Sequence, residues 1–493
     1  MKHSISRRDF LRTGLVATAG AAIASPLITQ RAHGANDTIG IGILGMGWRG
    51  GDLAKSIQRH EKTQIVAVAD PDKNNAAKAA QFEGAKAYAD LRELLDDPRV
   101  DVVFVSTCNH WHCLASILAM QAGKDVYVEK PLSHTQWEGR QVVNAARKYN
   151  RVCQLGTQQR SDLGLQNAAK TFLHEEQQLG RILYVQANRL GVREPIGKRD
   201  TPLPIPEEVD YNLWLGPAAD QPLYRDKFHY DWHWNFNTGN GEMGNWGTHI
   251  LDDIRNVCYR DSVMLPKRIL VAGGRAAWND AGNTPNVHFA FFDTGSFPTI
   301  LALSNMTASP TDKKDWSVPG ARSFSGPGSG YVVACEGGYY LGQRGSGKAI
   351  DLDGKEIAKF PGADHMHMHV GNFFEAVRNR TPQSLNAEIE QGHASSGWCN
   401  LANIGFQVGR PYSRAEAESI APDLEQWSAI LGDMEKHLAA FGVSVEGPEM
   451  RMSPILHHNE HSERFVGNYA DAANAFLKRQ YREPFVVPEI VID

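Results

Sequence analysis

Short apolar runs alternate with amphipathic stretches from Thr38 to about Arg160. The stretches carry apolar residues at three- and four-residue spacing, as helices do, whereas the runs are uninterrupted, as in strands buried on both faces. This alternation predicts a parallel sheet covered by helices. The expected strands are 39–44, 65–69, 100–106, 125–128 and 152–155, and the expected helices are 53–60, 76–82, 114–122 and 137–149.

Beyond Arg160 the alternation stops, and Gly, Pro and aromatic residues become frequent. Strand-like runs predict a second α/β domain with an open, mostly antiparallel or mixed sheet. The stretch 307–347 is rich in Gly, Ser and Pro and predicts a long loop. The expected strands are 182–186, 267–272, 287–292 and 299–303, and the expected helices are 369–379, 388–405 and 469–481.

The start of the chain has the pattern of an export signal. Arg7 and Arg8 precede a moderately apolar, Ala- and Gly-rich run at 13–28, which is typical of a twin-arginine signal peptide. The run is short for a bilayer about 30 Å thick, so we expect cleavage, after Gly34. An uncleaved anchor or a chance basic N-terminus is the alternative. A cleaved chain would be periplasmic or secreted.

These patterns divide the chain into four segments. We expect a signal peptide at 1–35, a Rossmann-type domain at 36–160, a second α/β domain at 161–410, and a C-terminal extension packing on the second domain at 411–493.

The composition of the chain indicates which classes of partner it binds. The 493 residues are 42% hydrophobic and 22% charged, with a formal charge of -5, which provides no attraction for nucleic acid or an anionic membrane. The six cysteines contain no C-x-x-C pair, so neither a zinc knuckle nor a dense disulfide framework is indicated. Small neutral molecules are the expected partners.

The first expected strand leads directly into a glycine-rich turn, Gly45-Met46-Gly47-Trp48-Arg49-Gly50. Such a turn between a strand and a helix binds a dinucleotide pyrophosphate, because the glycines allow a tight turn, a close approach of the ligand and close helix packing. Asp70, at the end of the next strand, can bond a ribose 2′-hydroxyl and would repel a 2′-phosphate, which favours NAD over NADP.

Two later strands end in polar residues at the same sheet edge, where ligands of such folds bind. One strand leads into Thr107 and then Asn109-His110-Trp111-His112, and the other ends in Glu129-Lys130-Pro131. Lys130 can carry a proton or bond a substrate hydroxyl, although a strand-end Glu-Lys pair is also common as a solvated pair.

With Gly244-Asn245-Trp246-Gly247-Thr248-His249, these motifs resemble the oxidoreductases typified by glucose-fructose oxidoreductase, inositol dehydrogenase and MocA. The resemblance implies a pyranose or polyol oxidised between two domains. It also implies a catalytic lysine, aspartate and histidine, which correspond to Lys130, Asn245 and His249. Asparagine cannot act as a base, and Asp252 or Asp253, one turn further on, is a candidate substitute.

The expected site combines the motif residues with neighbouring polar and aromatic positions. The expected catalytic residues are Lys130, His249 and Asn245. The expected cofactor residues are Gly45, Met46, Gly47, Trp48, Arg49, Gly50, Asp70, Thr107, Asn109, His112, Glu129, Lys130 and Gln158. The expected substrate residues are His110, Trp111, Arg160, Trp234, Trp246 and His249.

Two further patterns allow more than one interpretation. The segment 228–241 is unusually aromatic, which fits stacking on sugar rings and core packing equally well. His365, His367 and His369 alternate ahead of a helix without an obvious carboxylate partner, so we expect no metal site.

The sequence thus predicts an exported, homo-oligomeric, NAD-dependent oxidoreductase that acts on a sugar, glycoside or polyol and retains its cofactor. One alternative is a redox-neutral glycoside hydrolase that oxidises, eliminates and re-reduces. Another is a non-catalytic sugar-binding protein, which Asn245 at the aspartate position favours.

Overall fold

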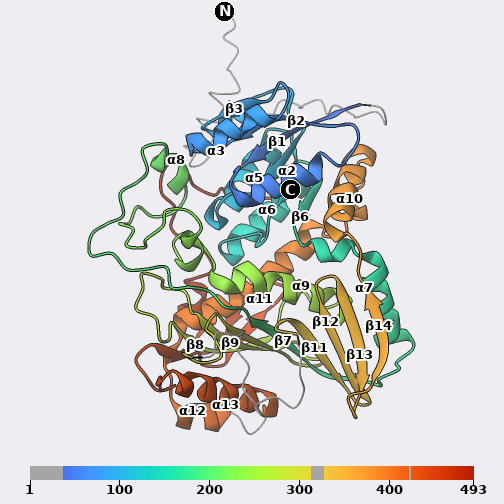
Figure 1. The fold of residues 1–493 in the computed structure, drawn as a ribbon, viewed down its shortest axis with the longest axis vertical. Helices are drawn as coiled ribbons and strands as arrows, with labels where there is room; N and C mark the ends of the chain where they lie inside the picture. The colour runs from blue at the N-terminus through green and yellow to red at the C-terminus, as the bar shows by residue number, and fades with distance from the viewer. Residues whose placement is uncertain (1–36, 312–326, 421–423, 493) are drawn as a thin grey trace, which may run out of the picture.

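The computed structural model describes residues 37–311, 327–420 and 424–492, and the expected signal peptide lies outside them. In Figure 1 the described chain forms two sheets, the first in the upper half and the second in the lower half, with helices between and around them.

Within the described residues the first sheet has six parallel strands in the order β3-β2-β1-β4-β5-β6. This is the order of a doubly wound dinucleotide-binding domain, so the predicted fold of this domain is confirmed. Its strands are β1 (Ile39–Leu44), β2 (Thr63–Ala69), β3 (Lys86–Tyr88), β4 (Val102–Val105), β5 (Asp125–Val128) and β6 (Cys153–Leu155). The sequence did not predict β3, because its three residues contain no apolar run.

Helices cover both faces of the first sheet. The helices α5 (His112–Gln121) and α6 (Gln136–Lys148) pack on one face. The other face is covered by α2 (Trp48–Ile57) and, from the second half of the chain, by α10 (His365–Asn379). Phe373 of α10 meets Phe104 of β4 edge to face, with ring centroids 5.7 Å apart. The chain therefore completes its first domain with a helix that the sequence assigns to the second.

The second sheet is open and mostly antiparallel, as predicted. Among the described residues it has twelve strands, and the pairing of β7 with β10 is the parallel one. Its strands are β7 (Ile182–Leu190), β8 (Arg268–Gly274), β9 (Val287–Asp293), β10 (Thr299–Ser304), β11 (Ser329–Cys335), β12 (Gly338–Gln343), β13 (Ser346–Asp351), β14 (Glu356–Pro361), β15 (Arg410–Pro411), β16 (Met450–Met452), β17 (Leu456–Asn459) and β18 (Arg464–Val466).

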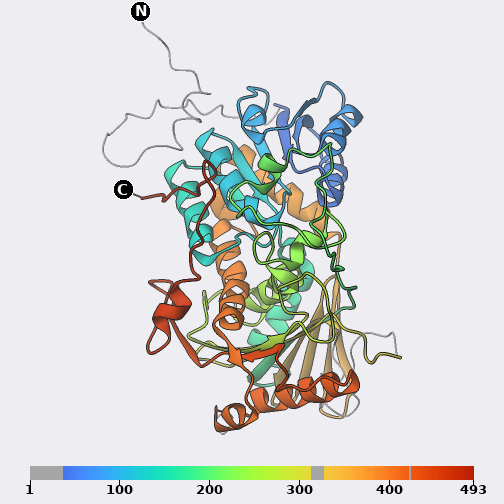
Figure 2. The ribbon, with the colours of Figure 1, turned by 90° about the vertical axis from the view of Figure 1, so that its left-hand side faces the viewer.

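One face of the second sheet is turned toward the first domain. There α9 (Thr248–Val257) and α11 (Ile389–Val408) cover the sheet, and α11 packs against α6 as well. The opposite face is covered by α13 (Glu425–Ala440) with α12 (Arg414–Ile420) (Figure 2). Helix α11 is thus buried between the two domains and packs against both.

The C-terminal extension contacts both domains. Beyond α12 and α13 the chain runs back along the side of the molecule toward the first sheet (Figure 2). There Phe485, Val487 and Ile490 join the core of the first domain, and the backbone N–H of Ile490 donates to Gln141 of α6 at 2.7 Å. The sequence predicted packing on the second domain alone.

Two expectations about local structure were wrong. The described part of 307–347 contains β11 and β12, and Gly342 serves packing there, since a Cβ at Gly342 would lie 2.3 Å from the Tyr331 ring. Residues 312–326 of the expected loop lie outside the described residues. Of the helix expected at 469–481, the structure forms the short α14 (Ala470–Asn474). Further along, the backbone turns outward to contacts with other segments, such as Leu477 O accepting from the N–H of Trp137 at 3.0 Å.

Replacing Phe373 by Ala should lower the stability of the first domain. The side chain is fully buried between α10 and the sheet, so its removal should cost about 3–5 kcal/mol. Thermal unfolding followed by circular dichroism would measure this loss as a lower melting temperature. Leu352→Ala is the matched control, because Leu352 is 64% exposed and its truncation should change the melting temperature little.

Candidate active site

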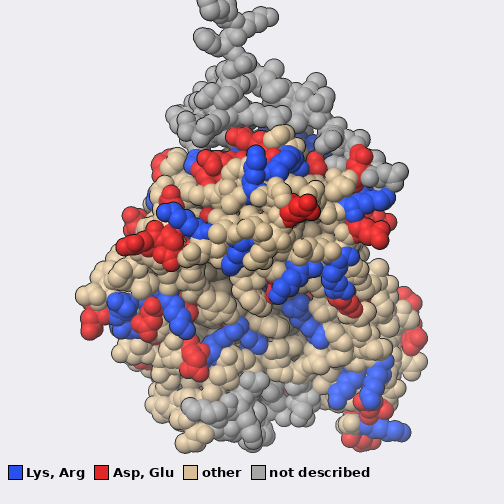
Figure 3. All heavy atoms as spheres, turned by 45° about the horizontal axis from the view of Figure 1, so that its top comes forward, with Lys and Arg blue, Asp and Glu red and all other residues tan. Residues whose placement is uncertain are grey.

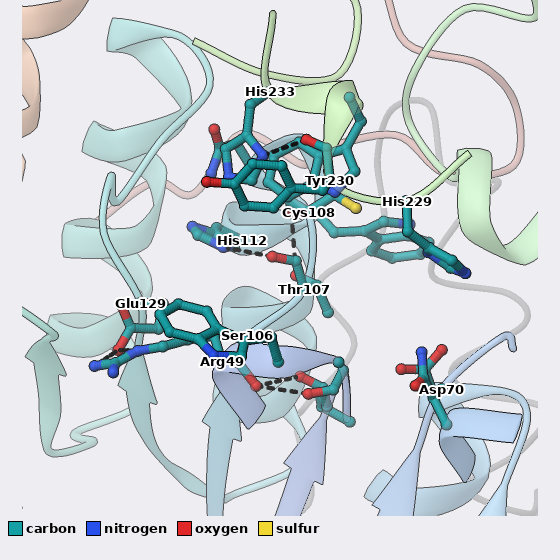
Figure 4. Close-up of a pocket in the computed structure, with 18 of the residues that line it drawn as sticks. Arg49, Asp70, Ser106, Thr107, Cys108, His112, Glu129, His229, Tyr230 and His233 are labelled. Atoms are coloured by element: carbon teal, nitrogen blue, oxygen red, sulfur yellow. Dashed lines mark hydrogen bonds and ion pairs between the residues drawn. The ribbon is translucent and has the colours of Figure 1, made fainter. Parts of the chain in front are cut away.

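A cavity of about 690 Å³ lies at the carboxyl edge of the first sheet, between the two domains. The first domain contributes the turn after β1 and the ends of β2, β4 and β5. The second domain contributes the segment 229–233, the residues just before α9, and Arg344 from the turn between β12 and β13. Figure 4 shows His229, Tyr230 and His233 on one side, facing Arg49, Ser106 and Asp70 on the other.

The glycine-rich turn has the geometry that a dinucleotide requires. Gly45 has a φ of +85°, which favours glycine, and a Cβ at Gly50 would lie 2.1 Å from the carbonyl oxygen of Gly45. Gly47 lines the cavity, and a Cβ there would meet no heavy atom within 4 Å. No side chain caps the N-terminus of α2, and no acidic residue lies in its first turn. The helix start is therefore open to an anion.

Asp70 lies at one end of the cavity, where β2 ends. Its carboxylate accepts the backbone N–H groups of Met46 at 2.8 Å and Asp72 at 2.9 Å. Burial raises the pKa of Asp70, and these two hydrogen bonds oppose the rise. Met46 thus contributes to the site through its backbone, by fixing the orientation of the carboxylate, and its side chain is buried in the core.

Glu129, at the end of β5, is anchored from two sides. Arg49 forms an ion pair with it at 2.6 Å, and the amide of Gln158 donates to it at 3.3 Å (Figure 4 shows the ion pair). Glu129 is 3% exposed. The carboxylate is held in place by protein groups, and it fixes Arg49 beside the start of α2.

The polar residues after β4 divide into ligand-facing and structural positions. Thr107, Asn109, Trp111 and His112 line the cavity, and the buried Oδ1 of Asn109 has no hydrogen-bond partner among the described residues. The ring nitrogens of His112 lie 2.7 Å from Pro131 O and 3.1 Å from Thr107 O. His112 therefore ties the loop after β5 to the end of β4.

Lys130 contacts the second domain directly. Its Nζ donates to the carbonyl oxygen of Asn245 at 2.6 Å and to the Asn245 side-chain Oδ1 at 3.1 Å. Burial lowers the pKa of Lys130 to about 8. The Asn245 amide donates to Glu242 at 3.1 Å, so Asn245 is fixed between an ammonium group and a carboxylate.

Glu242 is fully buried behind Asn245. Arg189 and Arg193 pair with its carboxylate at 2.7 and 3.1 Å. Although burial raises the pKa of Glu242, the two guanidinium groups more than offset this effect and hold the pKa below its ordinary value. Glu242 and Asn245 together hold the ammonium group of Lys130 in place.

His249, at the start of α9, lines the same cavity and is 6% exposed. Its ring lies 5.9 Å from the Trp246 ring in an edge-to-face arrangement. Burial, followed by the charges of Arg344 and Lys130, holds the pKa of His249 well below its ordinary value. The imidazole is therefore neutral near pH 7 and can accept a proton.

Three residues predicted to contact substrate do not line the cavity. His110 is 1% exposed, with its ring nitrogens at 3.1 and 3.0 Å from Thr238 O and Trp214 O. Arg160 is 4% exposed and pairs with Asp252 and Asp261, each at 2.8 Å. Trp234 is 3% exposed. All three are buried by structural contacts that sequence spacing does not reveal.

The candidate substitutes for the missing aspartate behave differently from each other. Asp252 forms an ion pair with Arg160 and accepts a hydrogen bond from the Ser395 hydroxyl at 2.6 Å. Asp253 is 4% exposed, its buried Oδ1 has no hydrogen-bond partner among the described residues, and burial raises its pKa well above the ordinary value. Neither donates to nor accepts from His249 among the described contacts.

The sequence did not predict several cavity residues. Arg344 lies in the stretch expected to be a loop, and Arg193 lies in a stretch without a motif. Segment 228–241 divides between the two interpretations: Trp234 is core, whereas other members line the cavity. These are His229, Tyr230, Trp232 and His233.

The three alternating histidines lie in different surroundings. His367 stacks on His60 with ring centroids 4.2 Å apart, His369 contacts Ser161 at 2.6 Å, and His365 accepts from Arg344 at 3.2 Å. In the described ranges no group of three His, Cys, Asp or Glu side chains is arranged to hold a metal ion.

The outer surface shows no dominant charge on the side that Figure 3 presents, where basic and acidic side chains are interspersed over mostly uncharged surface. Among the described helices, none is both long enough and apolar enough to cross a bilayer.

Fold and cavity together define a two-domain protein of the Rossmann class. Residues 39–157 match the profile of the Gfo/Idh/MocA oxidoreductase family for its NAD-binding Rossmann fold, and residues 196–302 match that family's C-terminal alpha/beta domain. The chain belongs to this family. Residues 4–24 match a twin-arginine translocation signal, which supports the predicted export.

Individual relatives match part of the chain. A glycosyl hydrolase family 109 protein of Solibacter usitatus is 32% identical over 165 residues, covering 30% of this chain and 38% of that protein. A levoglucosan dehydrogenase of Pseudarthrobacter phenanthrenivorans is 28% identical over 225 residues, covering 43% of this chain and 49% of the relative. The chain thus matches less than half the length of these curated relatives.

Solved structures share the fold. The structure of a levoglucosan dehydrogenase in complex with NADH and levoglucosan superposes with a TM-score of 0.53 at 16% identity, covering 75% of this chain and 96% of that one. A biliverdin reductase from Synechocystis sp. PCC 6803, in complex with biliverdin and NADP+, gives a TM-score of 0.52 at 14% identity, with 74% and 98% covered.

Replacing Gly47 by Ala should weaken nucleotide binding without destabilising the protein. The added methyl group meets no protein atom, but it projects into the space that a pyrophosphate requires, so the dissociation constant should rise by at least about tenfold. Titration of the protein with NAD, followed by tryptophan fluorescence, measures the change.

Gly51→Ala is the matched control for this test. A Cβ at Gly51, within α2, also meets no heavy atom within 4 Å, but Gly51 does not line the cavity. Equal weakening of NAD binding by both substitutions would contradict the assigned role of Gly47.

Proposed function

We propose that this chain is an exported NAD-dependent oxidoreductase that acts on a sugar, glycoside or polyol and keeps its nicotinamide cofactor tightly bound. The observation that carries the proposal is that one cavity joins an open glycine-rich turn to Lys130 and His249. A related levoglucosan dehydrogenase, by its name, acts on a sugar derivative.

The cavity residues fit a dinucleotide. Gly45, Gly47 and the start of α2 would hold the pyrophosphate, and Asp70 would bond the ribose hydroxyls at the far end. A carboxylate there would repel a 2′-phosphate, which supports NAD over NADP. When bound, the nicotinamide ring supplies the hydride acceptor.

Lys130 and His249 have complementary properties for oxidation of a carbinol. The neutral imidazole of His249 accepts the hydroxyl proton, while the ammonium of Lys130 donates a hydrogen bond to the oxygen on which negative charge develops. Asn245 positions Lys130 through its two acceptor oxygens. Trp246, beside His249, lines the cavity, where an aromatic ring can pack against a sugar.

Export makes cofactor retention necessary. The signal match at 4–24 supports a route that carries proteins already folded, with the cofactor loaded beforehand, to the periplasm or beyond. Because free NAD is scarce outside the cytoplasm, an enzyme that released it at each turnover would stop.

A redox-neutral glycoside hydrolase is the second candidate. The similarity to a glycosyl hydrolase family 109 protein favours it. Transient oxidation makes the neighbouring C–H bond acidic, elimination of the leaving group follows, and reduction restores the ring. This reaction needs the same proton acceptor and the same cofactor. A non-catalytic sugar-binding protein would also retain the fold, and Asn245 at the aspartate position is what favours it.

A combined cofactor and substrate assay tests the proposal. The purified protein is examined for bound nicotinamide by absorbance and fluorescence, then mixed with free sugars and aryl glycosides. We expect reduced cofactor to appear without release of the aryl group. Release of the aryl group without net reduction would identify the hydrolase, and the absence of any bound or bindable nicotinamide would reject both enzymes.

His249→Ala is the variant that separates the enzymes from a binding protein. Loss of the proton acceptor should lower turnover by about 10²–10⁴-fold while NAD binding is retained. Sugar binding that is unaffected, with no turnover in either protein, would favour the non-catalytic alternative.

The pH dependence should reflect Lys130. Its donor form is lost as pH rises through a pKa of about 8, so kcat/KM should fall on the alkaline side of that value. On the acid side it should stay level through the pH range in which an ordinary histidine titrates, because the pKa of His249 is held well below its ordinary value. Lys130→Arg, which stays protonated, should remove the alkaline fall even if the rate is reduced. An unchanged alkaline limb in this variant would contradict the assignment.

A further inference from the structure

Charged residues lining the cavity are unevenly distributed between its two ends. Around the end of β2, the carboxylates of Asp70, Asp72 and Asp90 outnumber the cation of Lys78. At the other end, which holds the proposed catalytic residues, cations outnumber Glu129. These cations are Arg49, Lys130, Arg193 and Arg344.

Ion pairing within the protein removes only part of this excess. Arg49 is matched by Glu129 at 2.6 Å. Arg193 shares the single carboxylate of Glu242 with Arg189, so two guanidinium groups face one negative charge. Lys130 is held by the uncharged oxygens of Asn245. The catalytic end therefore keeps a positive charge after every pair is formed.

The described contacts of Arg344 are with uncharged groups. Among the described residues no carboxylate lies within 4.0 Å of it. It donates to two neutral groups, His365 Nε2 at 3.2 Å and Gln158 Oε1 at 3.4 Å. Burial lowers its pKa, yet guanidinium groups stay protonated in proteins. The half-buried charge thus lacks a counter-ion.

The nearest unused carboxylate does not neutralise Arg344. Asp253 of α9 acts on Arg344 electrostatically but makes no ion pair with it, and burial beside Asp252 raises the pKa of Asp253. That shift favours the protonated, uncharged form. No carboxylate of the described residues then forms an ion pair with Arg344, and an anionic ligand would supply the missing charge.

The position of Arg344 indicates which ligand would supply this charge. Its guanidinium group lies 6.0 Å from the centre of the Trp246 ring, and its charge is one of the main causes of the lowered pKa of His249. The glycine-rich turn that fits the pyrophosphate belongs to the other domain, beside Arg49. Arg344 therefore lies at the end of the cavity where the substrate, rather than the cofactor phosphates, would bind.

We propose that the substrate is a sugar acid whose carboxylate is bound by Arg344. This inference rests on the proposed function and narrows its substrate class. A planar guanidinium matches the two oxygens of a carboxylate in a paired geometry, and a partly desolvated site strengthens the pair. Such a ligand supplies the negative charge that the catalytic end lacks.

Paired sugars test the proposal on the NAD-loaded protein. Glucuronate and gluconate are compared with glucose, and galacturonate with galactose, by isothermal titration and by formation of reduced cofactor. We expect at least one acid to bind at least about tenfold more tightly than its neutral parent. Arg344→Gln should remove that preference, and Arg344→Lys should keep part of it because the charge remains.

Arg181→Gln is the matched control, because Arg181 pairs with Glu336 on the surface, away from the cavity. It should leave the preference unchanged, and melting temperatures verify that each variant is folded. An equal affinity for acids and neutral sugars would overturn the inference. So would weaker NAD binding in Arg344→Gln with an unchanged sugar preference, which would assign Arg344 to the cofactor phosphates.

The two proposals fail in different ways. Oxidation of neutral sugars without preference for acids would retain the dehydrogenase and reject the carboxylate site. Arg344-dependent binding of an acid with no cofactor reduction would retain the carboxylate site and reject the dehydrogenase.

Discussion

The hydrogen bonds from Lys130 to Asn245 join the two domains where they enclose the cavity. Lys130 follows β5 of the first sheet, and Asn245 precedes α9 of the second domain. An ammonium group withdrawn from water needs strong acceptors, and here both come from one residue. The same contact therefore links the two domains and holds one of the charges of the site.

Glu242, buried behind Asn245, supplies a negative charge near Lys130, as an aspartate at position 245 would. Its charge reaches Lys130 through the Asn245 amide, which donates to Glu242 and accepts from Lys130. The carboxylate can be buried because Arg189 and Arg193 pair with it. The consequence is a site with a neutral histidine, a lysine of lowered pKa, and more cations than carboxylates lining the cavity near them.

Much of the first domain could be predicted from sequence because its signals are local. The glycine turn, the strand ends and the helix periodicity each depend on neighbouring residues, and the structure places Gly45, Asp70 and Lys130 on one cavity. Prediction failed where packing decides. Gly342 and Gly347 indicated a loop but make room for the rings of Tyr331 and Tyr340, and Arg160 looked available but is buried between Asp252 and Asp261.

The Rossmann fold and the dinucleotide turn followed from the sequence alone, because parallel strands end at one edge and a short motif specifies its own geometry. The expected roles of Lys130 and His249 came from the family resemblance. The charges at the end of the cavity near Lys130 and His249 depend instead on the tertiary structure. A net charge of -5 indicated neutral partners, yet the cavity gathers Arg193 and Arg344 from separate segments. Local charge depends on which residues the fold brings together and which carboxylates it buries elsewhere, and no count along the chain contains that information.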